Sequence, residues 1–209
     1  MGSINIHASL LPQYRGAAPI NWALIHGETQ TGVTSFFLRH EIDTGDLILQ
    51  EKMAIDLADD FGSLYDKLKV LGAALAARTV AAIAAGQAPS TPQPTTPDGL
   101  RPAPKLTKDT GRLDFGRPAA ELVNQVRGLS PAPAAYTTLP DGRGLKVFRA
   151  QATPAQATNA APGAWATDGR HRLRVRTADG WLDLLEVQLE GKKRMTVAEF
   201  LRGTKLELP

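Results

Sequence analysis

The stretch INIHASLLPQYRGAAP occupies residues 4–19, and IDTGD follows it at residues 42–46. The apolar run that ends at His7 has the length of a buried strand. Asn5 and His7 alternate along it, so their side chains are expected on one face. Asp43 lies in a loop further along the chain. Together the three offer an amide, an imidazole and a carboxylate, the groups that transfer of an acyl unit to an amine requires.

Each of the three groups has a candidate role in such a transfer. The Asn5 amide can donate a hydrogen bond to the developing oxyanion, and a protonated His7 can do so with charge assistance. Asp43 would favour the imidazolium form of His7 and accept, through water, the proton that the amine loses. Spacing alone is a weak signal, however. A histidine at a strand end is more often structural, and an aspartate before Thr-Gly is usually a turn residue.

The composition is that of an ordinary globular protein. The 209 residues are 43% hydrophobic and 22% charged. The chain has no cysteine, which excludes disulfides and thiolate metal sites. No apolar run approaches the roughly 20 residues that span a bilayer, and the N-terminus lacks the pattern of a signal peptide. We therefore expect a cytoplasmic protein with no membrane partner.

Positive charge is concentrated in the second half of the chain. Residues 1–97 hold 6 Lys/Arg and 9 Asp/Glu, whereas residues 98–209 hold 18 and 12, so the net charges are −3 and +6. This asymmetry suggests an anionic partner such as nucleic acid for the second half, although a solvated surface rich in Lys and Arg produces the same excess.

The first half of the chain is predicted to be mixed α/β. Its expected elements are, in order, a strand over 3–7, a helix from Pro19 to Gly27, strands over 31–38 and 46–53, and an amphipathic helix over 63–85. Either Asp60 or Ser63 can cap the long helix, and Gly86 can end it.

Prolines mark the main boundary. Six of them fall between Ala88 and Pro104. Because each one fixes φ and removes a backbone donor, this stretch is expected to be extended and semi-rigid. Residues 88–117 are therefore interpreted as a linker and joining segment between a first domain over 1–87 and a second domain over 118–209.

The second domain is predicted to begin with a helix and to continue as strands separated by turns. Asp-Gly pairs at 141–142, 168–169 and 179–180 are the turn signals. The expected elements are a helix over 118–128, strands over 145–150, 171–177 and 181–189, and a last helix over 197–201 that Thr196 caps and Gly203 closes. This alternation fits a small closed β-barrel.

Residues 4–53 resemble the folate-dependent formyltransferases. The resemblance rests on the N-x-H pair before S-L-L-P, the R-G-A-A-P loop, the T-G-V-T strand and the D-T-G-D loop. It implies that Asn5, His7 and Asp43 are the catalytic trio. The loop residues that it implies beside folate and substrate are Ser9, Leu10, Leu11, Pro12, Arg15, Gly16, Thr44, Gly45 and Asp46. Arg15 would position the substrate, although a loop-anchoring ion pair explains it equally well.

The resemblance also implies the fold class, α/β plus β. Family members have a doubly wound catalytic domain with about three βα units before the N-x-H strand, on the order of a hundred residues. These units supply much of the folate pocket. We therefore expect the first domain to be the C-terminal half of the doubly wound formyltransferase domain, followed by a small OB-like β-barrel domain.

Motifs beyond the prolines extend the resemblance over nearly the whole chain. KLTK at 105–108 and GRLDF at 111–115 resemble the segment that joins the two domains of the family. NQVRGLSPAP at 124–133 and GKKRM at 191–195 resemble the start and the end of the C-terminal barrel. These motifs favour the family members that act on methionyl-tRNA over the single-domain members that act on small ribotides.

A row of arginines is consistent with an RNA partner. In RHRLRVR at 170–176, strand alternation puts four arginines on one face, with Leu173 and Val175 on the other. Four like charges in a row repel one another, which makes more sense near a polyanion. A solvated face is the plainer interpretation of each arginine alone. The residues expected to bind tRNA are Lys105, Lys108, Arg170, Arg172, Arg174, Arg176, Lys192, Lys193 and Arg194.

The implied activity is formyl transfer from 10-formyltetrahydrofolate to the amino group of methionine on initiator tRNA. Two alternatives stay open. One is a formyltransferase for a nucleotide-linked amino sugar, since those relatives share the N-x-H and D-T-G-D motifs. The other is an inactive protein that only binds tRNA. No metal is expected, because His26, His40 and His171 lack ligand spacing.

Overall fold

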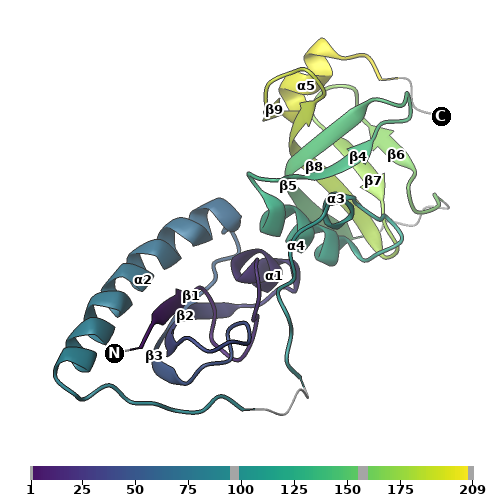
Figure 1. The fold of residues 1–209 in the computed structure, drawn as a ribbon. Coiled ribbons are helices and arrows are strands. Elements are labelled where there is room, and N and C mark those ends of the chain that lie inside the picture. Colours follow the sequence, from purple (N-terminus) through teal and green to yellow (C-terminus); the bar gives the residue numbers. More distant parts are fainter. Residues whose placement is uncertain (1, 95–98, 155–159, 207–209) are drawn as a thin grey trace. The chain divides into compact units, whose positions relative to one another are not determined.

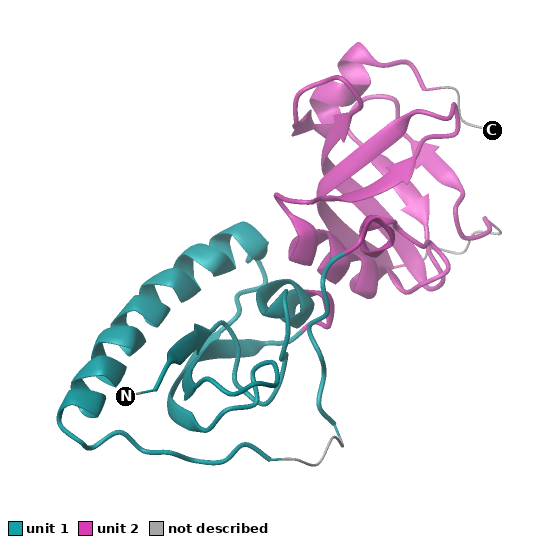
Figure 2. Cartoon of the chain, viewed as in Figure 1, with its two compact units in different colours: residues 1–24, 28–106 teal, residues 25–27, 107–209 magenta. Residues whose placement is uncertain are grey.

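The chain folds into two compact units (Figure 2), each with its own sheet. The first unit contains residues Met1–Leu24 and Glu28–Leu106, and the second contains Ile25–Gly27 and Thr107–Pro209. The computed structural model describes residues 2–94, 99–154 and 160–206.

The first unit contains a three-stranded antiparallel sheet covered by a long helix (Figure 1). Strand β1 (Ile4–His7) pairs with β2 (Gln30–Phe37), which pairs with β3 (Leu47–Ala54). Helix α2 (Phe61–Ala84) packs against all three strands, and the short α1 (Pro19–Ile25) precedes β2. The predicted elements of this unit are therefore present, with bounds shifted by only one or two residues.

The strands of this sheet differ from the doubly wound arrangement that the resemblance implied. That arrangement consists mainly of parallel strands joined by crossover helices, and antiparallel strands occur at its edge. Both strand pairings described in the first unit are antiparallel. The described residues thus form an α/β layer with no parallel pair among the three strands of the sheet.

Local side chains set both ends of α2. The Ser63 N–H donates to the Asp60 carboxylate at 2.9 Å, and the Asp60 N–H donates to the Ser63 hydroxyl at 3.1 Å, which together make a capping box. The two residues that the sequence offered as alternative caps therefore act together. Gly86 follows the last turn with a φ of 67°, the left-handed conformation that favours glycine. Between these ends, Leu64 and Leu75 are buried in the core of the unit.

Backbone hydrogen bonds tie both described parts of the proline-rich stretch, residues 88–94 and 99–104, to other segments of the first unit. Thr91 exchanges two backbone hydrogen bonds with Leu47, of 2.8 and 3.0 Å. The Ala103 N–H donates to the backbone oxygen of Arg15 at 2.8 Å. The boundary between the two compact units falls after Leu106.

The second unit is built on a six-stranded antiparallel sheet. The strand order is β4-β5-β8-β7-β6, and β9 pairs with β8. Helix α4 packs against β4, β5 and β8. The elements are α3 (Lys108–Gly111), α4 (Ala119–Leu129), β4 (Ala135–Thr138), β5 (Gly144–Pro154), β6 (Trp165–Thr167), β7 (Leu173–Arg176), β8 (Gly180–Leu189), β9 (Met195–Thr196) and α5 (Val197–Gly203).

The closed barrel predicted from the alternating strands is not seen. Among the described residues, β4 and β6 are the two ends of the strand order, and each pairs with a single neighbour. Register shifts between Val147 and Ala150 bend β5 without closing the sheet. Alternation along the sequence predicts strands, but a barrel also needs pairing between its first and last strands. An OB-like barrel is therefore not confirmed.

The strand predicted over 171–177 begins two residues later. The carboxylate of Asp168 accepts hydrogen bonds from the backbone N–H groups of residues 170–172, at 2.7 to 2.9 Å. These donors hold the pKa of the Asp168 carboxyl well below its ordinary value. They fold the segment into a turn, so β7 starts at Leu173.

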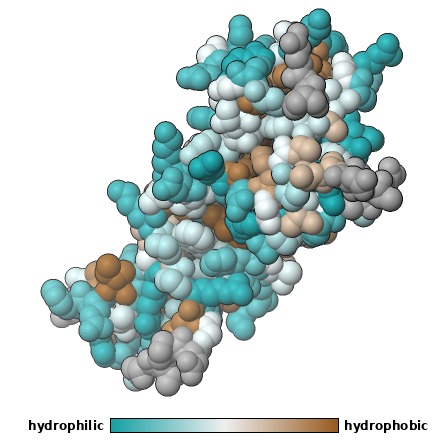
Figure 3. Space-filling model, turned by 90° about the vertical axis from the view of Figure 1, so that its right-hand side faces the viewer, coloured by the Kyte–Doolittle hydropathy of each residue, from teal (hydrophilic) through white to brown (hydrophobic). Residues whose placement is uncertain are grey.

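The surface is mainly polar on the face that Figure 3 shows, and hydrophobic residues lie there in separate patches. Exposed large hydrophobic side chains include Leu38, Ile42, Leu57, Tyr65, Val70 and Val80. Within the described part of the chain, none of the helices combines the length and the apolar character needed to cross a membrane.

Candidate active site

Strand β1 presents the first two predicted catalytic residues on one face. Asn5 lies opposite Phe36 and His7 lies opposite Thr34 on β2, so both side chains extend from the same side of the sheet. Asn5 is exposed, and its amide forms no hydrogen bond with any residue that the structure describes. His7 is only 6% exposed. The amide is therefore available to a substrate oxygen, whereas protein encloses the imidazole.

Both ring nitrogens of His7 face acceptors. Nε2 lies 2.8 Å from the backbone oxygen of Tyr14, and Nδ1 lies 3.6 Å from Oδ2 of Asp43. A carbonyl oxygen can only accept, so Nε2 carries a hydrogen, and a second proton on Nδ1 would face the carboxylate. When the ring carries both protons, each N–H faces an acceptor. A direct hydrogen bond from His7 to a substrate would require one of the two contacts to be exchanged.

Backbone geometry holds Asp43 beside His7. Asp43 has a φ of 55°, in the left-handed region, and its Oδ2 accepts a hydrogen bond from the Gly16 N–H at 2.9 Å. Two residues further on, a Cβ at Gly45 would lie 1.5 Å from the backbone oxygen of Phe37. Only glycine lets the loop pass this close to β2. The close approach of the two backbone segments therefore explains why the third residue of the D-T-G-D motif is glycine.

A residue that the sequence analysis missed connects the loops of the site. Gln93, in the proline-rich stretch, is only 7% exposed. Its Nε2 donates to the backbone oxygens of Asp43 at 2.9 Å and Gly45 at 2.7 Å. Its Oε1 accepts from Nε and Nη2 of Arg15, at 3.1 and 2.6 Å. The available sequence signal was an uncharged polar residue between two prolines, in a stretch interpreted as a linker.

The loop after β1 is fixed by its own hydrogen bonds. The buried Ser9 hydroxyl donates to the backbone oxygen four residues on, at 2.6 Å, and the Leu11 N–H donates to the Thr34 hydroxyl at 3.1 Å. Leu11 is buried, while Leu10 and Pro12 are half-buried. Ser9 and Leu11 therefore shape the loop, and Leu10 and Pro12 keep surface that a ligand can contact.

Thr44 and Asp46 are engaged by protein partners. Asp46 accepts from Arg39 Nη2 at 2.7 Å and from the Ser90 hydroxyl at 2.9 Å. The Thr44 hydroxyl donates to the backbone oxygen of Glu41 at 3.1 Å. These contacts shape the D-T-G-D loop. In the residues described, no group of three or more His, Asp or Glu is placed to hold a metal ion.

Most of the basic residues predicted to bind tRNA are exposed and unpaired. Arg194 is an exception, because it donates to Glu186 at 2.7 Å and lies over the ring of Phe148. The side chains that form no ion pair or hydrogen bond with the described parts of the chain are Lys105, Lys108, Arg170, Arg172, Lys192 and Lys193.

The row of four arginines predicted on one strand is divided. Only Arg174 and Arg176 lie on β7, while Arg170 and Arg172 lie in the turn before it. The guanidinium carbon of Arg174 is 4.3 Å from the centre of the Trp181 ring, and that of Arg176 is 6.0 Å from it. Arg174 and Arg176 are therefore engaged with the Trp181 ring, whereas Arg170 and Arg172 stay available to an anionic partner.

Two family models match the chain. Residues 1–80 match the model described as Formyl transferase, and residues 105–205 match the model described as Formyl transferase, C-terminal domain. Apart from residues 25–27, the first match falls in the first unit, and apart from residues 105–106, the second match falls in the second unit. Together the two matches cover most of the chain. Both models describe formyl transferases, a class of group-transfer enzymes, so the chain is similar to that class in both of its units.

A curated relative gives a closer comparison within that class. The methionyl-tRNA formyltransferase of Bacteroides fragilis is 48% identical to this chain over 209 residues. The match covers 97% of this chain and 64% of the relative. The chain thus spans somewhat less than two thirds of the length of that curated relative.

Solved structures share the fold at lower identity. HypX from Aquifex aeolicus in complex with tetrahydrofolic acid has a TM-score of 0.68 and 20% identity, over 99% of this chain and 36% of that chain. WlaRD, a sugar 3N-formyl transferase, has a TM-score of 0.66 and 20% identity, over 91% of this chain and 66% of that chain. At these identities the likeness shows the fold alone.

Proposed function

We propose that the chain takes part in translation initiation by moving a formyl group from 10-formyltetrahydrofolate to the amino group of methionine on initiator tRNA. The observation that carries the proposal is the pair of His7 and Asp43, 3.6 Å apart, on the strand face that also presents the exposed Asn5 amide. The 48% identity to the methionyl-tRNA formyltransferase of Bacteroides fragilis supports the choice of acceptor. The sugar-acting WlaRD is 20% identical.

The Asn5 amide would stabilise the charge that develops during the transfer. The amine nitrogen bonds to the formyl carbon, the bond from that carbon to N10 of the folate breaks, and an amine proton passes to the leaving nitrogen. Negative charge builds on the formyl oxygen between these events. An exposed amide without a protein partner is a donor for that oxygen, and losing such a donor typically costs about 10²–10³ in kcat.

His7 would act on the same oxygen mainly through its charge. Its two N–H groups face Tyr14 and Asp43. An imidazolium held there places positive charge beside the reacting carbonyl, and its low exposure strengthens the interaction. If a substrate oxygen replaces the backbone oxygen of Tyr14, Nε2 donates to it directly.

Asp43 would manage the proton of the incoming amine. The ammonium form must lose a proton before nitrogen can attack the formyl carbon. Oδ2 of Asp43 faces His7 and the Gly16 N–H, while Oδ1 has no hydrogen bond within the described residues. Oδ1 is thus the atom that can accept this proton through a bound water. Gln93 holds the loop through the backbone oxygen of Asp43 and so acts as a positioning residue.

The second unit would hold the RNA. Five of the six unpaired basic residues belong to it, in the turn before β7, at the start of α3 and in the loop after β8. Lysine and arginine contacts to phosphates release counterions, so each contact adds roughly 0.7–0.9 to the slope of log K on log salt. We therefore expect tRNA binding that weakens steeply as salt is raised.

Product formation with two acceptors tests the proposal. The purified chain is mixed with 10-formyltetrahydrofolate and either methionyl initiator tRNA or a nucleotide-linked amino sugar, and the products are measured by mass spectrometry. Formylmethionyl-tRNA is the expected product. Formylation of the sugar instead would support the sugar alternative. Binding of tRNA with no product on either acceptor would refute the proposed activity and leave an RNA-binding protein.

A further inference from the structure

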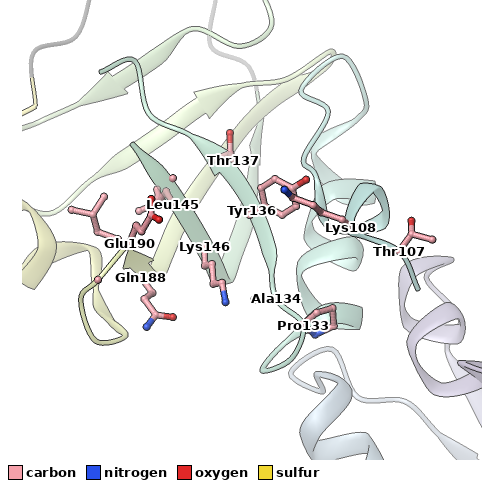
Figure 4. A pocket seen from close by; sticks show the side chains of 14 residues that line it. Thr107, Lys108, Pro133, Ala134, Tyr136, Thr137, Leu145, Lys146, Gln188 and Glu190 are labelled. Atoms are coloured by element: carbon pink, nitrogen blue, oxygen red, sulfur yellow. The ribbon is translucent and has the colours of Figure 1, made fainter. Parts of the chain in front are cut away.

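The second unit contains a cavity that none of the predicted catalytic residues lines. Its volume is about 500 Å³, within the range of roughly 300–1,000 Å³ typical of sites for small molecules. It lies between α3, β4, β5 and the loop that follows β8 (Figure 4). Residues that line it and can contact a ligand are Lys108, Tyr136, Lys146, Gln188 and Glu190.

Three of these residues form one row across the sheet. Tyr136 on β4 pairs with Lys146 on β5, and Lys146 pairs with Gln188 on β8. Directly paired residues of antiparallel strands extend their side chains from the same face. Their sequence neighbours Ala135 and Val147 are buried in the core, so the row lies on the outer face. An aromatic ring, an ammonium group and an amide thus follow one another along one wall of the cavity.

Helix α3 positions the ring of Tyr136. A Cβ at Gly111 would lie 3.2 Å from Cδ1 and Cε1 of that ring, so the glycine lets the helix pack closely against it. The ring is half-buried, and its hydroxyl has no hydrogen-bond partner in the part of the chain that the structure describes. Lys108, from the same helix, also lines the cavity. The ring is therefore held in place while one side remains open to the cavity.

The charged side chains that line the cavity form no ion pairs with the described residues. Lys108 and Lys146 are exposed and form no ion pair with described residues, and the same holds for Glu190. Gln188 donates from Nε2 to the backbone oxygen of Lys192 at 2.7 Å, which leaves its Oε1 to accept. The two lysine ammonium groups can bind phosphate, and the aromatic ring can stack on a base. Gln188 Oε1 and the Glu190 carboxylate can accept hydrogen bonds from the exocyclic N–H groups of a base.

We propose that this cavity takes one unpaired nucleotide from a single-stranded stretch of RNA. Its base stacks on Tyr136, and Lys108 and Lys146 hold the adjoining phosphates. A base inside a duplex is stacked on its neighbours and cannot reach the ring, so the site selects unpaired RNA. The inference rests on the proposed function, which supplies RNA as the acceptor, and it adds a base contact to the phosphate contacts of the second unit.

The stacking contact is tested by fluorescence anisotropy with two labelled probes, a 12-nucleotide single-stranded RNA and a duplex of the same strand. The variants are Tyr136→Leu, which keeps apolar volume without the ring, and Tyr136→Phe, which keeps the ring. Circular dichroism confirms that each variant folds. Tyr136→Leu should weaken single-strand binding by roughly 5- to 150-fold, as expected for one base stacked on an aromatic side chain. Tyr136→Phe should bind as wild type does, and duplex binding should stay unchanged in both.

The phosphate contact is tested by the salt dependence of single-strand binding. Lys146→Gln should reduce the slope of log K on log salt by about 0.7, the value for one phosphate on a single strand. Lys52→Gln is the matched control, because Lys52 is an exposed lysine on β3 of the first unit. It should leave the slope unchanged.

The outcomes separate this inference from the proposed function. If Tyr136→Leu binds single-stranded RNA as tightly as wild type, the base contact is wrong even when formyl transfer is intact. An equal loss on single strand and duplex would also overturn it, since stacking affects only unpaired bases. If the wild-type chain binds no RNA, the proposed function fails and the inference fails with it.

Discussion

Replacing Gln93 with alanine should release the loop that carries Asp43. The substitution removes four hydrogen bonds: two from Nε2 to the backbone oxygens of Asp43 and Gly45, and two from Arg15 to Oε1. Because Gln93 is 7% exposed and Gly45 is also buried, water replaces little of what is lost.

The loss of stability in Gln93→Ala depends on whether each hydrogen bond that it removes is neutral or involves a charged group. A neutral hydrogen bond contributes about 1 kcal/mol net, and one to a charged group about 1.5–3 kcal/mol. Arg15 is half-buried and regains some hydration. We therefore expect Gln93→Ala to lower the free energy of unfolding of the first unit by about 3 kcal/mol. For a unit of this size, that corresponds to a melting temperature lower by roughly 10–20 °C.

Urea unfolding and hydrogen exchange measure this prediction. The matched control is Gln87→Ala, because Gln87 is exposed and its side chain has no partner within the described residues. The control should stay within about 0.5 kcal/mol of wild type. Gln93→Glu should resemble Gln93→Ala, since it places an oxygen against two backbone oxygens. Equal unfolding midpoints for Gln93→Ala and the control, with unchanged amide exchange over 43–46, would refute the role given to Gln93.

Three further predictions concern other parts of the chain. Burial alone would raise the pKa of the Asp59 carboxyl, but hydrogen bonds from Lys67, Ser63 and the backbone lower it overall. The ionised Asp59 carboxylate therefore stabilises the fold above its ordinary pKa of about 4, and this stabilisation is lost as the pH falls below that value. In urea unfolding, Asp59→Asn should be less stable than wild type at pH 7 and should approach wild type near pH 2. A difference in stability that stays constant with pH would contradict this reasoning. Gly45→Ala should prevent the first unit from folding, because its Cβ would overlap a backbone oxygen, and a native near-ultraviolet circular dichroism spectrum would show otherwise. Arg172→Ala should reduce the salt dependence of tRNA binding and leave the melting temperature unchanged. Arg174→Ala loses the contact of the guanidinium with the Trp181 ring and should lower the melting temperature. The opposite pattern would reverse the roles assigned to these two arginines.

Features that depend on neighbouring residues were predictable from the sequence. The strands and helices of the first unit begin and end within one or two residues of their predicted bounds. The sequence offered Asp60 and Ser63 as alternative caps of α2 and Gly86 as its end. In the structure both residues form the cap, and Gly86 has a positive φ. Alternation on β1 put Asn5 and His7 on one face, and the register with β2 agrees.

Features that depend on distant partners were not predictable. Gln93 bonds with Arg15, 78 residues away, and with Asp43, 50 residues away, so no local pattern signals its role. Closure of the predicted barrel is not seen among the described residues, and it depends in the same way on pairing between strands far apart in the chain. The row of four arginines was divided because the carboxylate of Asp168 binds three successive backbone N–H groups, which outweighs strand alternation there.

The rate of formylmethionyl-tRNA formation should be compared among wild type, His7→Ala and His40→Ala. His40 is an exposed histidine of the same unit and serves as the control. If the imidazolium beside Asp43 stabilises the oxyanion, His7→Ala should lower kcat by about 10²-fold or more, with tRNA affinity unchanged and His40→Ala as active as wild type. An unchanged kcat in His7→Ala would mean that His7 and its pairing with Asp43 have no part in formyl transfer.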